Sequence, residues 1–157
     1  MPYQTFQGSL DARNLRVGVV VSRFNEFITE ALAKGALETL QKNGCLRENI
    51  TLLKVPGAWE LPVAAKALAA RCDAVVALGA VVRGETPHFE YVAGGAADGL
   101  QAVSVETGVP VAFGVLTTDN MQQAMDRAGG KSGNKGAEAA EVAIELANLL
   151  KTLKEHR

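Results

Sequence analysis

The chain has 157 residues, of which 48% are hydrophobic and 21% charged, and its formal net charge is −1. These values are typical of one globular domain and exclude a disordered chain. The charge balance gives no reason to expect a nucleic acid or an anionic membrane as partner, and no stretch approaches the roughly 20 apolar residues of a membrane-spanning helix.

A polar segment opens the chain, and strand and helix patterns then alternate. Residues 1–14 show no clear period and are predicted to be an N-terminal arm. In chain order, the predicted elements are a strand at 16–21, a helix at 25–43, a strand at 50–55, a helix at 59–71, a strand at 74–82, a helix at 87–106, a strand at 110–116, and helices at 119–128 and 135–154. No linker or repeat divides residues 15–157, which are assigned to one domain.

The alternation predicts a single-domain α/β fold, a three-layer sandwich with a central four-stranded parallel sheet and helices on both faces. This is a flavodoxin-like arrangement. The last helix has an apolar face of Val142, Leu146, Leu149, Leu150 and Leu153, broadened by alanines. Such a wide band indicates either a deeply packed core helix or a helix that also touches a neighbouring subunit.

The beginning of the chain and its cysteines bear on the compartment. The segment from Met1 to Thr5 lacks the charged and apolar regions of a secretory signal, so we expect a cytoplasmic protein. Cys45 and Cys72 have no metal-type spacing, and in a reducing compartment they are expected to remain free thiols. No other residues have metal-ligand spacing, so the predicted site contains no metal.

Ligands of open parallel sheets bind beyond the carboxyl ends of the strands. Four segments follow the predicted strands, namely 22–26, 56–60, 83–88 and 117–120. They contain Trp59, which is the only tryptophan, and His88, which is the only histidine outside the C-terminal tail. The candidate site is therefore expected at this edge of the sheet.

The third of these segments has the composition of an anion-binding helix start. Thr86 is a good N-cap, Pro87 suits the first helical position, and Gly84 allows a tight turn. Backbone N–H groups at such a start attract phosphate, and His88 would stand beside the anion as a proton carrier. Glu85 must then point away. The alternative is an ordinary capped helix with an exposed histidine.

Phe24 and Trp59 follow different strands at the same sheet edge, where they can hold a flat heterocycle by stacking. The alternative is that both rings simply pack in the core. Glu60 can accept hydrogen bonds from ligand hydroxyl or amide groups. The basic, glycine-rich stretch at 127–136 is interpreted as a turn between two helices, because it lacks the spacing and the preceding strand of a P-loop.

Five segments together give the chain a family resemblance from Arg16 to Leu150. They read SRFN, VPGAWELP, GAVVRGETPHFEYV, PVAFGVLTT and RAGGKSGNKGAEAA. In this order and spacing they closely resemble the lumazine synthases. The resemblance implies condensation of 5-amino-6-(D-ribitylamino)uracil with 3,4-dihydroxy-2-butanone 4-phosphate to 6,7-dimethyl-8-ribityllumazine, with release of phosphate and water. It implies no cofactor and no metal.

The resemblance also implies roles for individual residues. Phe24 would stack on the pyrimidine, and His88 would carry protons. The backbone of Ala80, Val81 and Val82 would bind the pyrimidine, and Ala58, Trp59 and Glu60 would hold the ribityl chain and ring edge. Glu85 and Thr86 would bind the phosphate. An adjacent subunit would lend Phe113 to the pyrimidine side and Arg127 to the phosphate, and Lys135 would be a basic residue near the same phosphate pocket. Trp59 stands where many relatives have Phe or Tyr, which keeps the position aromatic.

The resemblance implies a homo-oligomer, with pentamers that carry the site between subunits and close into an icosahedral shell. The shell is expected because the turn at 129–134 carries no insertion. Riboflavin synthase is a further candidate partner. Two rival interpretations remain open, namely a flavin-binding or shell-forming paralogue with weak catalysis and a generic flavodoxin-like phosphate-binding module. A purely structural protein fits least well.

Overall fold

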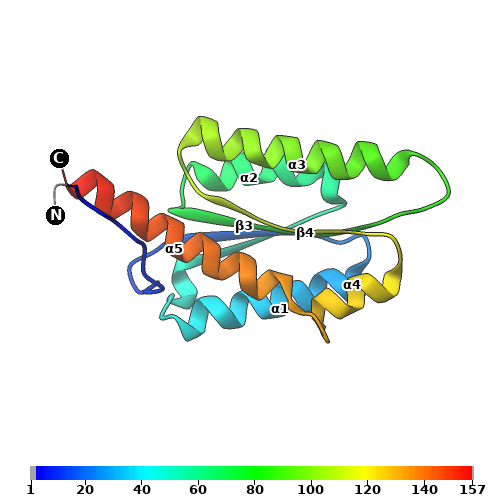
Figure 1. The fold of residues 1–157 in the computed structure, drawn as a ribbon, viewed down its shortest axis with the longest axis horizontal. Coiled ribbons are helices and arrows are strands. Elements are labelled where there is room, and N and C mark those ends of the chain that lie inside the picture. Colours follow the sequence, from blue (N-terminus) through cyan, green and yellow to red (C-terminus); the bar gives the residue numbers. More distant parts are fainter. Residues whose placement is uncertain (1–2, 157) are drawn as a thin grey trace.

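The computed structural model describes residues 3–156 and shows three layers, with α2 and α3 on one face of the sheet and α1, α4 and α5 on the other (Figure 1). The four-stranded sheet has the order β2-β1-β3-β4, and all neighbouring strands are parallel. Its strands are β1 (Val17–Ser22), β2 (Ile50–Val55), β3 (Ala74–Val82) and β4 (Val111–Thr118). The predicted α/β fold is therefore confirmed.

The helices lie close to their predicted ranges. They are α1 (Glu26–Lys42), α2 (Leu61–Ala69), α3 (His88–Thr107), α4 (Met121–Arg127) and α5 (Lys135–Glu155), with short 3₁₀ turns η1 (Arg47–Asn49) and η2 (Ala58–Glu60). The single helix predicted at 59–71 was wrong, since η2 precedes α2. Pro62 at the start of α2 explains the break, because it lacks an N–H group and is best tolerated in the first turn of a helix.

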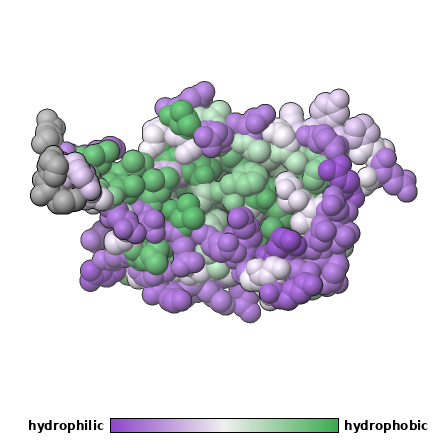
Figure 2. Space-filling view, viewed as in Figure 1, coloured by the Kyte–Doolittle hydropathy of each residue, from purple (hydrophilic) through white to green (hydrophobic). Residues whose placement is uncertain are grey.

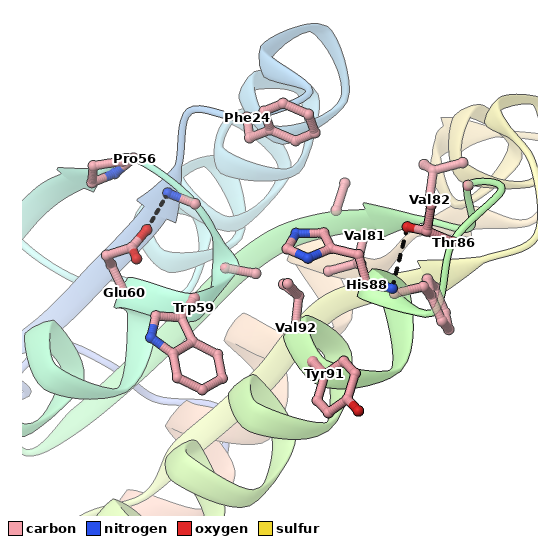
Figure 3. A pocket seen from close by; sticks show the side chains of 15 residues that line it. Phe24, Pro56, Trp59, Glu60, Val81, Val82, Thr86, His88, Tyr91 and Val92 are labelled. Atoms are coloured by element: carbon pink, nitrogen blue, oxygen red, sulfur yellow. Dashed lines mark hydrogen bonds between the residues drawn. The ribbon is translucent and has the colours of Figure 1, made fainter.

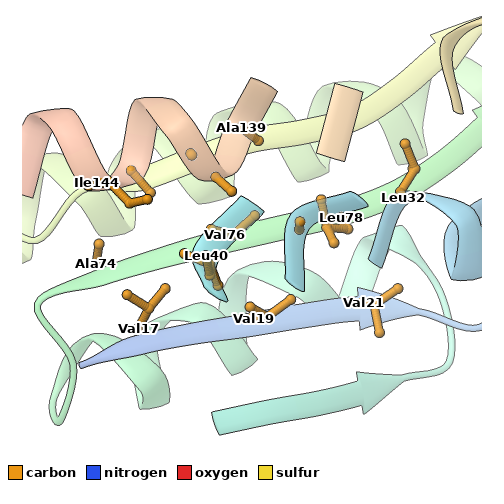
Figure 4. Packing of buried hydrophobic residues seen from close by; sticks show 14 of the residues in the cluster. Val17, Val19, Val21, Leu32, Leu40, Ala74, Val76, Leu78, Ala139 and Ile144 are labelled. Atoms are coloured by element: carbon orange, nitrogen blue, oxygen red, sulfur yellow. The ribbon is translucent and has the colours of Figure 1, made fainter. Parts of the chain in front are cut away.

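The side chains of β1 alternate between two apolar cores. Val17, Val19 and Val21 face α1 and α5 (Figure 4). Val20 belongs to the other core, with residues of α2 and α3. β3 is buried along eight of its nine residues, whereas β2 is an edge strand and only partly buried. The central strands thus read as continuous apolar runs because both of their faces are covered.

The orientation of α5 differs from the sequence interpretation. The residues that α5 buries in the core are small ones and one isoleucine: Gly136, Ala139, Ala140, Ala143, Ile144 and Ala147. Val142, Leu146 and Leu153 are exposed instead. Small side chains let α5 approach α1 closely, and a Cβ added to Gly136 would lie only 2.1 Å from the carbonyl oxygen of Leu32.

The leucine side of α5 therefore belongs to the surface. Figure 2 shows a band of apolar side chains on this face, and a cavity there is lined by Leu10, Glu138, Glu141, Val142, Glu145, Leu146 and Leu149. A wide exposed apolar area marks an interaction surface. The interpretation of a helix buried on all sides is therefore wrong, and a contact of the exposed side with a neighbouring subunit stays a prediction.

The predicted arm lies along α5 without forming a helix or strand over residues 3–12. The side-chain amide of Asn148 donates to the backbone oxygens of Ser9 and Asp11, both at 2.9 Å. The rings of Phe6 and His156 lie 5.2 Å apart, which places the two ends of the described chain together. Met1 and Pro2 of the predicted arm and Arg157 of the predicted domain lie outside the described residues.

The predicted turn at 127–136 contains a small hairpin of β5 (Ala128–Gly130) and β6 (Gly133–Asn134). Gly129 and Gly133 have positive φ angles of 106° and 85°, which non-glycine residues rarely adopt. The glycines therefore serve a tight reversal rather than a phosphate-binding loop. No helix within residues 3–156 is long and apolar enough to cross a membrane.

Two helical glycines allow a matched test of the α1–α5 contact. We expect Gly136→Ala to lower the free energy of unfolding by roughly 1–3 kcal/mol, because the methyl group meets the backbone of Leu32. Gly94→Ala in α3 should raise it by about 0.5–1 kcal/mol, because apart from the neighbouring residues and backbone of α3 itself no described atom lies within 4 Å of that Cβ, and alanine favours helix.

Urea unfolding of the two variants beside the wild type measures both changes. If both substitutions changed the free energy of unfolding in the same direction, the close contact of Gly136 with Leu32 would not explain the effect of Gly136→Ala.

Candidate active site

A cavity of about 800 Å³ lies at the carboxyl ends of β1, β2 and β3, where three of the four predicted segments meet (Figure 3). It is lined by Phe24, Pro56, Gly57, Ala58, Trp59, Glu60, Ala80, Val81, Val82, Gly84, Thr86, His88, Phe89, Tyr91 and Val92. Nine of the predicted site residues are among these. The structure thus brings together groups that lie up to 64 positions apart, from Phe24 to His88.

Two aromatic side chains border this cavity without packing into the core. Phe24 is 71% exposed and Trp59 is 61% exposed. The alternative of plain core packing is therefore wrong for both rings. Exposed aromatic faces at a cavity rim offer a large apolar surface to a flat ligand. In Figure 3 the His88 ring lies between the Phe24 and Trp59 sides of the cavity.

Trp59 rests on a glycine of α3 that the sequence interpretation missed. A Cβ added to Gly95 would lie 2.3 Å from Cζ3 of Trp59. One turn further along, a Cβ at Gly99 would lie 2.6 Å from Pro62. The glycines of α3 therefore let η2 and α2 pack against that helix, and Gly95 fixes how far the indole stands from the cavity. A glycine inside a helical pattern is the signal for such an approach.

Glu60 is held at the mouth of the cavity. The backbone N–H of Gly57 donates to Oε1 of Glu60 at 2.9 Å, so one carboxylate oxygen is fixed by the 56–60 turn (Figure 3). The second oxygen has no hydrogen-bond partner among the described residues and can accept from a ligand hydroxyl or amide group. Glu60 and His88 are the two side chains of the cavity lining best suited to proton transfer or charge pairing.

In the loop from Gly84 to His88, the helix begins at a different residue from the one predicted. α3 begins at His88, and Pro87 rather than Thr86 occupies the N-cap position. The hydroxyl of Thr86 accepts a long hydrogen bond of 3.4 Å from the backbone N–H of His88. Proline cannot cap with its side chain, so apart from the long Thr86 contact no side chain caps the start of α3, where Thr86 and His88 both line the cavity. Glu85 is exposed and does not line the cavity, in agreement with a carboxylate that points away.

Arg83 supports this loop from behind. Its guanidinium forms an ion pair with Glu90, donates to Asp119 at 3.1 Å, and lies 4.3 Å from the centre of the Phe89 ring. The hydrogen bond from Arg83 lowers the pKa of Glu90, and the two carboxylates raise the pKa of Arg83. Glu90 and Asp119 thereby balance the charge of Arg83, which connects β3, α3 and the segment before α4.

The end of β3 offers backbone groups to a ligand. The pairing of β1 with β3 stops at Val21 and Leu78, whereas the pairing of β3 with β4 continues to Val82 and Thr118. Beyond Leu78, alternate backbone groups of β3 therefore face a side that has no strand. An amide-like ring edge can bind such groups. Asn25, which sequence reasoning passed over, already occupies one of them, the Ala80 carbonyl.

Three predicted site residues lie elsewhere. A second cavity of about 520 Å³ is lined by Phe113, Val115, Leu116, Thr117, Thr118, Gln123, Arg127, Ser132, Lys135 and Glu138. It shares no lining residue with the first cavity. Phe113 is partly exposed on the outer edge of β4, and Arg127 is exposed at the end of α4. The guanidinium of Arg127 donates to the Gln123 carbonyl at 3.0 Å.

The two cavities divide the chemistry between them. Among the described residues that line the first cavity, none is lysine or arginine. The second cavity holds Arg127 and Lys135, which are natural partners of a phosphate. A phosphorylated ligand in the first cavity would find backbone N–H groups but no cation from its own chain. Within residues 3–156, no group of three or more His, Cys, Asp or Glu side chains is arranged to hold a metal ion.

An open parallel sheet with an aromatic cavity at its carboxyl edge defines the chain as an α/β ligand-binding protein of the kind that holds flat, polar molecules. A family model described as 6,7-dimethyl-8-ribityllumazine synthase matches residues 14–151. Two proteins of that name, from Nitratidesulfovibrio vulgaris strains DP4 and Hildenborough, are 49% identical to it over 152 residues, which cover 96% of this chain and 97% of theirs. The chain belongs to the 6,7-dimethyl-8-ribityllumazine synthase family.

The contact of Gly95 with the Trp59 indole can be tested by enlarging one side chain and then reducing the other. Gly95→Ala should displace Trp59, shift the tryptophan fluorescence emission and weaken binding of the pyrimidine substrate by roughly tenfold, because the ring is pushed into the cavity. Adding Trp59→Phe to Gly95→Ala should restore most of the affinity, since the smaller ring leaves room for the methyl group.

Isothermal titration of the single and double variants measures this coupling. Additive losses of affinity would show that the two positions do not act through their contact.

Proposed function

We propose that this chain condenses 5-amino-6-(D-ribitylamino)uracil with 3,4-dihydroxy-2-butanone 4-phosphate to 6,7-dimethyl-8-ribityllumazine, with release of phosphate and water, the penultimate step of riboflavin biosynthesis. The observation that carries the proposal is the first cavity, whose exposed aromatic rings, free strand-end backbone groups and histidine meet at one place in a member of this family.

The first cavity supplies contacts for the pyrimidine and its ribityl chain. Phe24 stacks on the ring, and the backbone of Ala80, Val81 and Val82 binds its polar edge. Ala58, Trp59 and the free oxygen of Glu60 hold the ribityl hydroxyl groups. The flat ring is suited to an aromatic face, and the hydroxyl groups to a carboxylate acceptor.

The phosphate of the second substrate lies at the open start of α3, with Thr86 and the backbone of Glu85. Amine attack on the ketone, loss of water, loss of phosphate and ring closure all require proton transfers. His88 carries these protons in the proposal, which its position in the lining of the same cavity supports. Most of the acceleration then comes from holding the two substrates in register, which lowers a barrier by up to about 7–11 kcal/mol.

The phosphate also needs a cation, which we propose comes from an adjacent subunit. Arg127 reaches the phosphate of the neighbour's site, Phe113 closes its pyrimidine side, and Lys135 lies close by. The separation of the two cavities within one chain and the absence of lysine and arginine from the described lining of the first support this arrangement. The uncovered leucine side of α5 supplies apolar surface for the contact.

The assembly proposed is a pentamer in which each first cavity faces the second cavity of a neighbour. We further propose that pentamers close into an icosahedral shell, because the hairpin of β5 and β6 is short, and riboflavin synthase is a candidate partner. Sedimentation that shows free pentamers alone would remove the shell. A cytoplasmic location is also part of the proposal.

The reaction is tested by mixing the purified protein with both substrates and following lumazine absorbance and phosphate release against a control without enzyme. We expect clear acceleration with one phosphate released for each lumazine. A folded oligomer that gives no acceleration but retains flavin would instead establish a flavin-binding paralogue, which the aromatic cavity also suits.

Replacing the proton carrier should slow the enzyme without abolishing its activity. We expect His88→Ala to lower kcat by roughly 10²-fold, because a general acid–base contributes in this range and substrate positioning remains. The KM values should change little. Turnover that falls to the uncatalysed rate, with folding and substrate binding intact, would contradict the proposal that substrate positioning supplies most of the acceleration.

Mixed oligomers test whether the site is shared. One chain carries Phe24→Ala with His88→Ala, and the other carries Arg127→Ala, so each alone has only damaged sites. Coassembly in equal amounts should restore activity to about a quarter of the wild-type value, because a random ring pairs two intact halves at about one interface in four. Activity no higher than that of the separate variants would place all three residues in one chain's site.

A further inference from the structure

Asn25 has an unusual backbone for its position. Its φ and ψ angles are 62° and 49°, and among the described residues other than glycine it has the only positive φ. Asparagine tolerates this left-handed conformation better than most residues, but the conformation is still disfavoured. The residue lies between Phe24 and the first turn of α1, where its carbonyl accepts from the N–H groups of Ile28 and Thr29. Its strained backbone therefore sets the direction in which the chain runs from Phe24 into α1.

The side chain of Asn25 does not perform the usual task of an N-cap asparagine. Asn120 and Asn134 cap α4 and α5 by accepting hydrogen bonds from backbone N–H groups of the first turn. Asn25 makes no such bond to α1. Its amide instead donates to the carbonyl oxygen of Ala80 at 2.9 Å, across 55 positions of sequence. A stabilising cap is thus given up for a contact with the lining of the first cavity.

This contact continues the sheet where its backbone pairing has ended. β1 and β3 are paired only as far as Val21 and Leu78, and Ala80 lies two residues beyond. The side chain of Asn25 takes the place of the missing strand at Ala80. On its other side, Phe24 is tied to the second loop, since its N–H donates to the Pro56 carbonyl at 3.0 Å. Phe24 is therefore fixed between β2 and β3 although its ring is mostly exposed.

We propose that Asn25 is a positioning residue for the pyrimidine subsite, a role that rests on the function proposed above. The amide of Asn25 holds the 22–25 turn against β3, which sets the Phe24 ring at its stacking distance before any ligand binds. The same hydrogen bond occupies the Ala80 oxygen and leaves the neighbouring strand-end groups of β3 for the ligand. Asn25 acts through Phe24 and β3 and takes no part in proton transfer.

Two substitutions separate the side chain from the backbone. Asn25→Gly keeps the left-handed conformation readily and removes the amide. Asn25→Asp keeps a similar shape but replaces the donor by a carboxylate that faces the Ala80 carbonyl. We expect each to raise KM for 5-amino-6-(D-ribitylamino)uracil roughly tenfold, with kcat within about threefold of wild type and KM for the phosphorylated substrate unchanged.

Asn43→Gly is the matched control at the other end of α1. The amide of Asn43 donates to the Thr39 carbonyl at 2.8 Å, so the control also removes an asparagine side chain bonded to a backbone oxygen. Asn43→Gly should lower the thermal midpoint of unfolding about as much as Asn25→Gly does, and it should leave both KM values unchanged. A rise in KM with Asn43→Gly as large as with Asn25→Gly would reduce the Asn25 effect to general destabilisation.

Binding of the same pyrimidine is also read without turnover, from the fluorescence of Trp59, which is the chain's only tryptophan. The wild type should bind, and the two Asn25 variants should bind roughly tenfold more weakly. Wild-type affinity in both variants would overturn the positioning role. If the wild type binds the pyrimidine and the Asn25 variants do not, but no lumazine forms, the proposed reaction fails while the role of Asn25 stands.

Discussion

The parallel direction of β1, β2 and β3 is the constraint on which the rest of the structure depends. Parallel strands end on the same side, so every loop that leaves them must begin at one edge of the sheet. Three loops that are distant in sequence thereby become the walls of one cavity, with Phe24, Trp59 and His88 on separate walls. β1 stops short of β3, which leaves the end of β3 uncovered at the centre of that edge.

The stagger of the strands and the positions of the charged side chains explain why one chain has two separate cavities of different chemistry. The first cavity has aromatic rings, backbone groups and a carboxylate, and the second has the cations. Arg83 stands in the chain between Val82 and Gly84, which both line the first cavity, but Glu90 and Asp119 already engage its charge. A phosphate in the first cavity therefore lacks a positive side chain from its own chain, and in a closed ring the neighbour is the natural source.

Much of the fold was predictable, because burial on both sheet faces leaves a clear pattern. The strands at 50–55 and 74–82 were predicted at the residues where they occur, and the meeting of three loops at the carboxyl edge followed from their order. The orientation of α5 was not predictable. An apolar band fixes which residues avoid water, but not which of them face the core and which face a partner. The alanines lie inward and let α5 come close to α1, and this choice of side is decided by the tertiary structure.

The supporting residues of the site were missed for a related reason. Asn25 and Arg83 have no distinctive spacing, and their partners Ala80 and Asp119 are respectively 55 and 36 positions away. The start of α3 was predicted at Pro87 with Thr86 as cap, which is the usual order, whereas the chain begins the helix at His88. The assignment of substrate contacts to individual residues remains a prediction from the family resemblance.

The outward leucines of α5 have a consequence for how the protein responds to dilution. In the proposed assembly, the exposed Val142, Leu146 and Leu153 are buried only when copies of the chain associate, so part of the burial free energy comes from association. In the proposed assembly, folding and association are then linked equilibria, and the temperature of unfolding depends on protein concentration. Heating and dilution then both shift the equilibrium from the assembly toward dissociated and unfolded chains.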